Sequence, residues 1–181
     1  MPFKMLSTYL SNDEGGKELR ELSILMSQRT HYDNSRYLSQ GTIIQEQAGE
    51  KRYLLCLQPS CDCVRLKGST VFIFCSMAVN ADPKKNAATH VVYNEAKFED
   101  LIYKPEIKSC VALEFKPNKG RIVAKDLEFV DVGKKEDDEN KKYKWIAQLK
   151  PKHAHKAVEQ FARELSRVGL TESEWLRLRA K

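Results

Sequence analysis

The feature of this chain that most constrains its fold is a series of short β-type segments between residues 41 and 149, with no helical pattern between them. The segments are rich in Val, Ile, Phe and Tyr, and clusters of Gly, Pro, Asn and Lys separate them. They cover residues 42–45, 52–58, 63–66, 70–77, 90–93, 98–103, 109–115, 122–132 and 143–149. Consecutive strands without crossover helices pair antiparallel, so the pattern predicts one bent antiparallel sheet that closes into a small barrel, SH3-like or similar.

One of these segments is predicted to be the central strand. Residues 70–75 read Thr-Val-Phe-Ile-Phe-Cys and are apolar at successive positions, which is typical of a strand that is buried on both faces. Residues 48–50 and 116–120 contain the Gly, Pro and Asn residues that favour tight turns. We therefore expect hairpin connections at these two places.

Helical patterns flank the β-type region. Asp13 suits the cap of a helix over residues 14–28. The apolar stripe of this helix consists of Leu19, Leu22, Leu25 and Met26, at spacings of three and four. The stripe predicts that the helix packs against the sheet.

Two further helices are predicted at the C-terminal end. Pro151 suits a first helical turn, and an apolar stripe follows from Ala154 to Val168. Thr171 and Glu174 form a capping box for a last short helix that carries Trp175. The predicted class is α+β, mainly antiparallel β, in a single domain. Its parts are residues 1–40 with the N-terminal helix and a connecting segment, 41–149 with the barrel core, and 150–181 with the helical pair.

Charge and cysteine content narrow the function classes. Lys and Arg exceed Asp and Glu by 31 to 25, which gives a formal net charge of +6 and permits contact with nucleic acid or an acidic partner. Five cysteines cannot all pair within one chain. No secretory signal is recognised at the N-terminus, and no apolar run reaches the ~18 residues that span a bilayer. We therefore predict reduced thiols in a cytoplasmic protein that does not enter a membrane.

The segment 52–66 contains the candidate site. Two β-type runs meet at a Gln58-Pro59-Ser60 corner, which Cys61, Asp62 and Cys63 follow directly. If this part is a strand, Cys61 and Cys63 lie on one buried face and Asp62 points the other way. We expect Asp62 to accept hydrogen bonds from the backbone or from an arginine, with Arg52 and Arg65 as candidates.

Catalytic and cofactor motifs are not recognised in the sequence. There is no Cys-x-x-Cys pair, no zinc-finger spacing, and no Gly-rich loop between a strand and a helix. A cysteine nucleophile needs a base, and the four histidines lie in no recognisable motif. We predict no metal and no cofactor, and the sequence favours a non-catalytic protein without excluding an enzyme.

Three segments, 38–44, 53–66 and 166–176, together resemble the C-terminal, non-receiver region of bacterial response-receiver-domain proteins. The most specific parts of this resemblance are Cys56-Leu57-Gln58-Pro59-Ser60-Cys61-Asp62 and the run from Arg167 to Trp175. The resemblance covers most of 38–179, loosely between 77 and 142. It implies that the chain is the companion domain without its receiver, and that its partner is an ATPase similar to histidine kinases. No phospho-acceptor aspartate carries over.

Three functions remain as hypotheses. The first is a non-catalytic regulatory or interaction module of a bacterial signalling or defence-type system, which docks on a kinase-like ATPase, a receiver domain or a second copy of itself. The second is nucleic-acid binding through the basic C-terminal helix and the aromatic residues Tyr53, Tyr93, Phe98 and Tyr103. The third is an effector enzyme centred on Cys61 and Asp62. The residues predicted for a recognition surface or structural junction are Arg52, Gln58, Cys61, Asp62, Arg65, Arg167, Glu174 and Trp175.

Overall fold

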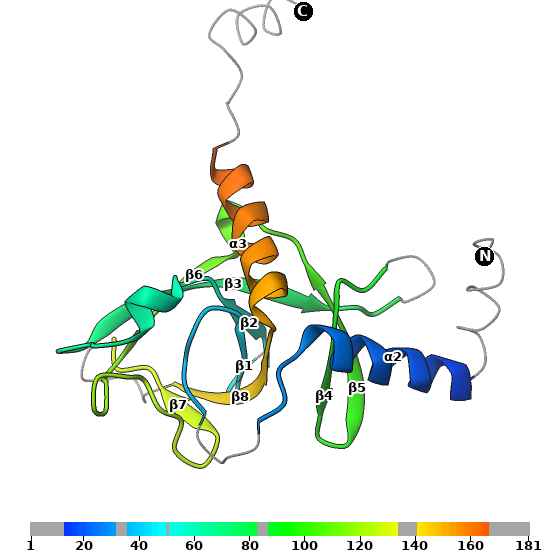
Figure 1. The fold of residues 1–181 in the computed structure, drawn as a ribbon, viewed down its shortest axis with the longest axis horizontal. Helices are drawn as coiled ribbons and strands as arrows, with labels where there is room; N and C mark the ends of the chain where they lie inside the picture. Colours follow the sequence, from blue (N-terminus) through cyan, green and yellow to red (C-terminus); the bar gives the residue numbers. More distant parts are fainter. Residues whose placement is uncertain (1–12, 32–35, 50, 83–86, 134–140, 167–181) are drawn as a thin grey trace, which may run out of the picture.

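The computed structural model describes residues 13–31, 36–49, 51–82, 87–133 and 141–166 (Figure 1). Within these residues, eight strands form one antiparallel sheet and two α-helices flank it. The elements are α2 (Asp13–Ser27), β1 (Thr42–Glu46), β2 (Tyr53–Cys56), β3 (Thr70–Val79), β4 (His90–Asn94), β5 (Lys97–Tyr103), β6 (Cys110–Phe115), β7 (Glu128–Val130), β8 (Lys142–Gln148) and α3 (Pro151–Leu165). Two short 3₁₀ turns, η1 (Ser60–Cys63) and η2 (Ile107–Ser109), complete them. The predicted α+β class is confirmed.

The sheet follows the order β4-β5-β3-β2-β1-β8-β7, and β6 pairs with β3 outside this path. The path is open, with β4 and β7 at its ends, so the predicted closed, SH3-like barrel is not confirmed. The chain after β7 nevertheless approaches β6, because the Val132 amide donates to the Glu114 carbonyl at 2.8 Å. The curved sheet encloses one of the two cores described below.

The long strand β3 is central, as residues 70–75 predicted. It pairs with β2 on one side, while β6 pairs with its first half and β5 with its last residues on the other. Successive side chains of a strand point to opposite faces. Phe74 therefore lies in one hydrophobic cluster and Cys75 in the other, and Ile43 and Ile44 of β1 divide in the same way. Phe72, Phe74 and Cys75 are buried and Ile73 is half-buried, whereas Val71 at the start of the run is 51% exposed.

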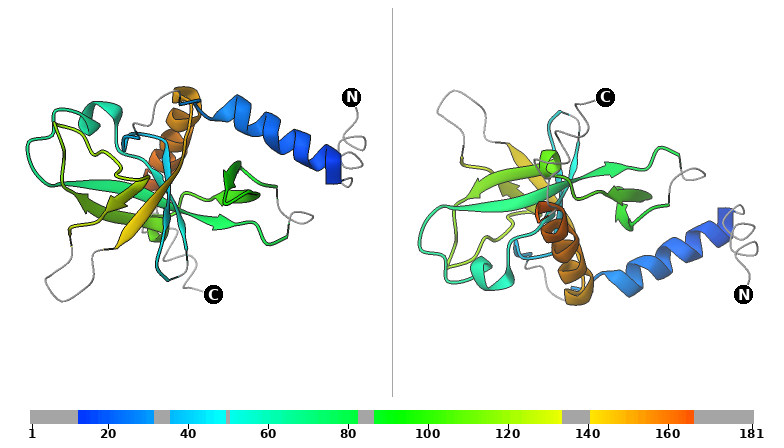
Figure 2. Two further views of the ribbon diagram at one scale, coloured as in Figure 1. Left: turned by 90° about the horizontal axis from the view of Figure 1, so that it is seen from below. Right: turned by 90° about the horizontal axis from the view of Figure 1, so that it is seen from above.

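The helix α3 covers one face of the sheet. Ala154, Ala157 and Phe161 are buried against the cluster that contains Ile43 and Leu55. Pro151 occupies the first turn, where its missing amide hydrogen costs no helical hydrogen bond. Figures 1 and 2 show α3 standing against the curved sheet, whereas α2 extends outward and away from α3. The two helices therefore lie on different parts of the sheet.

Two predicted β-type segments differ in the structure. Residues 63–66 form no strand, because the turn η1 ends at Cys63 and bends follow it. Only Glu128–Val130 of the predicted 122–132 strand forms a ladder, opposite β8. The predicted last helix with Thr171 and Trp175 lies outside the described residues.

Candidate functional site

The corner after β2 is a 3₁₀ turn and not a strand. The Asp62 amide donates to the Pro59 carbonyl at 3.0 Å, and the Cys63 thiol bonds the same carbonyl at 3.2 Å. Cys63 is buried, and burial raises the pKa of its thiol to about 11. Cys61 and Asp62 are exposed, and the Cys61 thiol lies 3.3 Å from Asp62 Oδ1. The prediction that Cys61 and Cys63 share one buried face is therefore wrong.

The remaining predicted residues do not join this corner. Arg52 precedes β2, at the strand end opposite η1, and its Nε donates to Glu46 Oε2 at 2.9 Å. Arg65 is exposed and has a left-handed backbone φ of 59°. Gln58 is half-buried at the start of the corner. Arg167, Glu174 and Trp175 lie outside the described residues. The described members of the predicted set therefore do not form one site, and the bond expected from Arg52 to Asp62 is not formed.

Glu46 carries out the structural role that was expected of Asp62. Its side chain is 3% exposed and accepts hydrogen bonds from Arg52 and from Lys141 Nζ, the latter at 2.8 Å. Burial opposes ionisation, but the bonds from Lys141 and Arg52 outweigh it and hold the pKa of Glu46 below its ordinary value. This carboxylate joins β1 to the residues that flank β2 and β8.

Glu46→Gln is expected to lower the free energy of unfolding at pH 7 by about 1–2 kcal/mol, because charged hydrogen bonds are lost while both cations stay partly solvated. The folded pKa lies below the ordinary 4.5, so this stabilisation is present above that pH and is lost as the pH falls through the folded pKa. Urea unfolding between neutral and acid pH should show a flatter profile for Glu46→Gln. Glu128→Gln, which alters an exposed pair with Lys142, should retain the native profile, and equal profiles for Glu46→Gln and the native chain would contradict the assignment.

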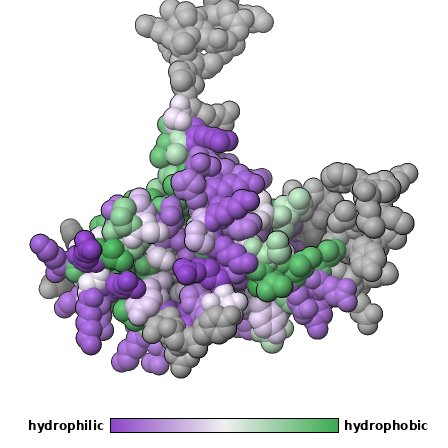
Figure 3. All heavy atoms as spheres, viewed as in Figure 1, coloured by the Kyte–Doolittle hydropathy of each residue, from purple (hydrophilic) through white to green (hydrophobic). Residues whose placement is uncertain are grey.

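The apolar stripe of α2 faces solvent. Leu22, Leu25 and Met26 are 52%, 63% and 61% exposed and Leu19 is half-buried, so the prediction that this stripe packs on the sheet is wrong for three of its four residues. Figure 3 shows hydrophobic residues gathered over the part of the molecule where α2 lies. Three large apolar side chains within five residues of one helix therefore form an open surface.

Polar bonds fix α2 to the sheet through its other face. Arg20 binds Asp100 of β5 through two hydrogen bonds of 2.8 and 3.0 Å. Gln28 Nε2 donates to the Val91 carbonyl of β4 at 2.6 Å. The end of the helix is fixed by the Lys150 amide, which donates to the Ser27 carbonyl at 2.8 Å. The helix is thus positioned without burial of its apolar stripe.

A cleft separates α2 from the β4–β5 hairpin. It has a volume of about 440 Å³, and its apolar lining consists of Ile24, Leu25, Tyr93 and Phe98. The rings of Tyr93 and Phe98 lie 5.1 Å apart, and Tyr93 is more than half exposed. We call the residues Leu22, Ile24, Leu25, Met26, Tyr93 and Phe98 the α2 surface.

A buried polar network holds the hairpin under this surface. Asn94 of β4 donates to Gln45 Oε1 at 3.1 Å and lies 3.0 Å from the Tyr53 hydroxyl. Lys144 Nζ donates to Asn94 Oδ1 at 3.1 Å. The network ties β4 to β1, β2 and β8 and satisfies the polar atoms of the Asn94 amide. The cleft therefore has a fixed floor.

Two of the aromatic residues predicted to stack on nucleic acid, Tyr53 and Tyr103, are buried and cannot reach a base. Tyr93 is exposed and Phe98 is half-buried, and both belong to the α2 surface. The sequence showed Leu22, Leu25 and Met26 as a stripe but gave no sign that it stays uncovered. Tyr93 and Phe98 join the α2 surface only because the β4–β5 hairpin lies beside α2, which is distant in the sequence.

Comparisons of the chain with family models, with curated proteins and with solved structures find no match. The resemblance to the receiver-associated proteins stays a prediction. No helix in the described part of the chain is both long and apolar enough to cross a membrane. The described residues also contain no group of three or more His, Cys, Asp and Glu side chains that could hold a metal ion. The five cysteines are free thiols.

Proposed function

We propose that this chain is a non-catalytic interaction module of a bacterial signalling or defence-type system, and that it binds a protein partner through the α2 surface. The observation that carries the proposal is the exposure of Leu22, Leu25 and Met26 on a helix that polar bonds already hold in place. Contiguous exposed apolar side chains mark interaction sites in proteins. The partner is a histidine-kinase-like ATPase, the class that the sequence resemblance implies.

The shape of the surface favours a helix of the partner. Leu22, Leu25 and Met26 recur at spacings of three and four, which is the spacing of a ridge that packs into a second helix. The cleft beside Leu25 accepts one apolar side chain, with the Tyr93 and Phe98 rings as its floor. The cleft is also lined by charged residues of both signs, Lys17, Glu21 and Arg29, which form a charged rim.

Isothermal titration of the chain with a histidine-kinase-like ATPase tests the proposal. The native chain should bind with a Kd of about micromolar or tighter. Leu25→Glu should weaken binding at least about thirtyfold, because a carboxylate would be buried without a partner. Ile107→Glu is the matched control, since Ile107 is 69% exposed in η2, away from the α2 surface.

Failure of the native chain to bind, or equal binding of Leu25→Glu and Ile107→Glu, would contradict the proposal. Light scattering of the chain alone tests whether a second copy of the chain, in place of the ATPase, occupies the α2 surface. A dimer that Leu25→Glu dissociates would show that a second copy of the chain, and not the ATPase, covers the α2 surface.

A further inference from the structure

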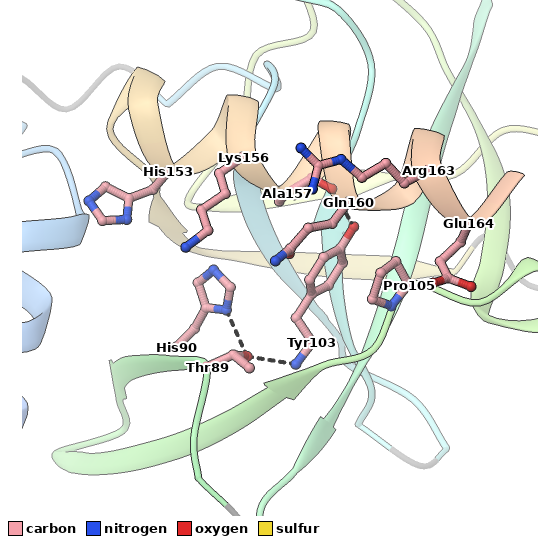
Figure 4. Close-up of a pocket in the computed structure, with 10 residues that line it drawn as sticks. All are labelled: Thr89, His90, Tyr103, Pro105, His153, Lys156, Ala157, Gln160, Arg163 and Glu164. Carbon is pink, nitrogen blue, oxygen red and sulfur yellow. Dashed lines mark hydrogen bonds between the residues drawn. The ribbon is translucent and has the colours of Figure 1, made fainter. Parts of the chain in front are cut away.

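A cavity of about 540 Å³ lies between α3 and the β4–β5 hairpin (Figure 4). It shares no lining residue with the cleft beside α2. The sheet contributes Thr89, His90 and Tyr103, and α3 contributes His153, Lys156 and Arg163. This volume is within the range of pockets that hold small-molecule ligands. Figure 4 shows Lys156 pointing toward His90, with Gln160 and Arg163 farther along the helix.

The walls of the cavity are fixed by hydrogen bonds. The Tyr103 hydroxyl donates to the Ala157 carbonyl at 2.8 Å and joins β5 to α3. Thr89 Oγ1 accepts from the Tyr103 amide at 2.7 Å and donates to the Leu101 carbonyl at 3.1 Å. His90 Nδ1 lies 3.0 Å from the same oxygen, whose proton is already used, so the imidazole donates there and turns Nε2 to the cavity. The sheet side of the cavity is therefore fixed in position.

Positive charge gathers in this cavity. Lys156 and Arg163 make no ion pair with any other residue in the described part of the chain. Glu164 is the acidic residue of the lining, and Figure 4 places it at the end of the cavity away from His90. Burial, followed by the nearby His153 and Lys156, lowers the pKa of His90 to about 4. A bound anion would offset the positive charges of Lys156 and Arg163, whereas His90 is neutral near pH 7.

We propose that the cavity binds a small molecule that carries a di- or triphosphate, such as a nucleoside diphosphate. Lys156 and His153 lie one helical turn apart and reach one phosphate. Arg163 is seven residues beyond Lys156, about two turns or 10 Å along the axis, and its planar guanidinium suits a second phosphate. Thr89 and Gln160 add neutral hydrogen-bonding groups.

Isothermal titration of the full chain with ADP and with inorganic pyrophosphate tests this site. We expect both probes to bind, and Lys156→Gln and Arg163→Gln each to weaken binding by about tenfold, because each removes a charge-assisted contact. Lys152→Gln is the matched control, since Lys152 is an exposed lysine of α3 that does not line the cavity, and it should bind within about twofold of the native chain. The His90 ring resonances should shift on addition of ADP in the native chain.

Absence of binding of both probes at about 5 mM would overturn the proposal. It would also be overturned if Lys152→Gln weakened binding as much as Lys156→Gln, since the interaction would then depend on net charge alone. Tighter binding of a single-stranded oligonucleotide, with the same dependence on Lys156 and Arg163, would assign the site to nucleic-acid phosphates instead. All three substituted side chains are on the exposed flank of α3, and unchanged thermal unfolding confirms that each variant is folded.

Discussion

Phe74→Ala is expected to lower the free energy of unfolding by about 3–5 kcal/mol, the largest effect of the substitutions considered. Phe74 is fully buried in the centre of β3, and its ring lies 6.2 Å from that of Phe115. The cluster around it is enclosed by Leu38, Cys63 and Ile122 from three connecting segments, so a cavity left by the ring cannot collapse easily. Urea unfolding of the purified variant measures the loss.

Two control variants separate the core from exposed apolar positions. Val71→Ala is on the same strand but at a half-exposed position, and its cost should stay below about 1 kcal/mol. Leu25→Ala on α2 should change the free energy of unfolding by less than about 0.5 kcal/mol. If Leu25→Ala destabilised the chain as much as Phe74→Ala, the α2 surface would be part of the core and the proposed function would fail.

Gly41→Ala is the second substitution with a large expected effect, a destabilisation of about 2–4 kcal/mol. Gly41 has a φ of +82°, and an added Cβ would lie 2.5 Å from Cβ of Ala154. The backbone cannot move away, because the Gly41 amide donates to Cys56 and its carbonyl accepts from Leu149. The substitution therefore forces α3 away from the sheet.

Gly49→Ala separates the two causes. Gly49 also has a positive φ, of +74°, but an added Cβ there meets no atom within 4 Å. Its cost should be about 1 kcal/mol, the backbone contribution alone. Equal losses for Gly41→Ala and Gly49→Ala, measured by thermal unfolding, would show that α3 does not approach β1 as closely as described.

The strands were predictable because apolar and β-branched residues recur in short runs between turn residues. Residues 71–75 are all apolar, so both faces of the strand carry apolar side chains. This run alone predicted the central position of β3. Residues 63–66 were predicted as a β-type run after the Gln-Pro-Ser corner, and Cys61 and Cys63 were expected to share one buried face. A 3₁₀ turn after Pro59 replaces the strand geometry, so the burial expected for Cys61 was wrong.

The candidate sites were less predictable than the sheet. The periodicity of Leu22, Leu25 and Met26 showed that α2 has an apolar face, but periodicity does not say what covers a face. The spacing of His153, Lys156 and Arg163 on one side of α3 was available in the sequence. His90 and Tyr103 join them only because the β4–β5 hairpin folds against α3, a contact between segments about 50 residues apart.

In the proposed function, the apolar side chains of α2 are open in the free chain and become covered when the partner binds. Methyl NMR of Leu22, Leu25 and Met26 with a water-soluble paramagnetic agent measures this directly. We expect strong broadening of these methyl signals in the free chain and protection from broadening after a histidine-kinase-like ATPase is added. Methyl groups that are already protected in the free chain, or that remain equally broadened in the presence of the ATPase, would contradict it.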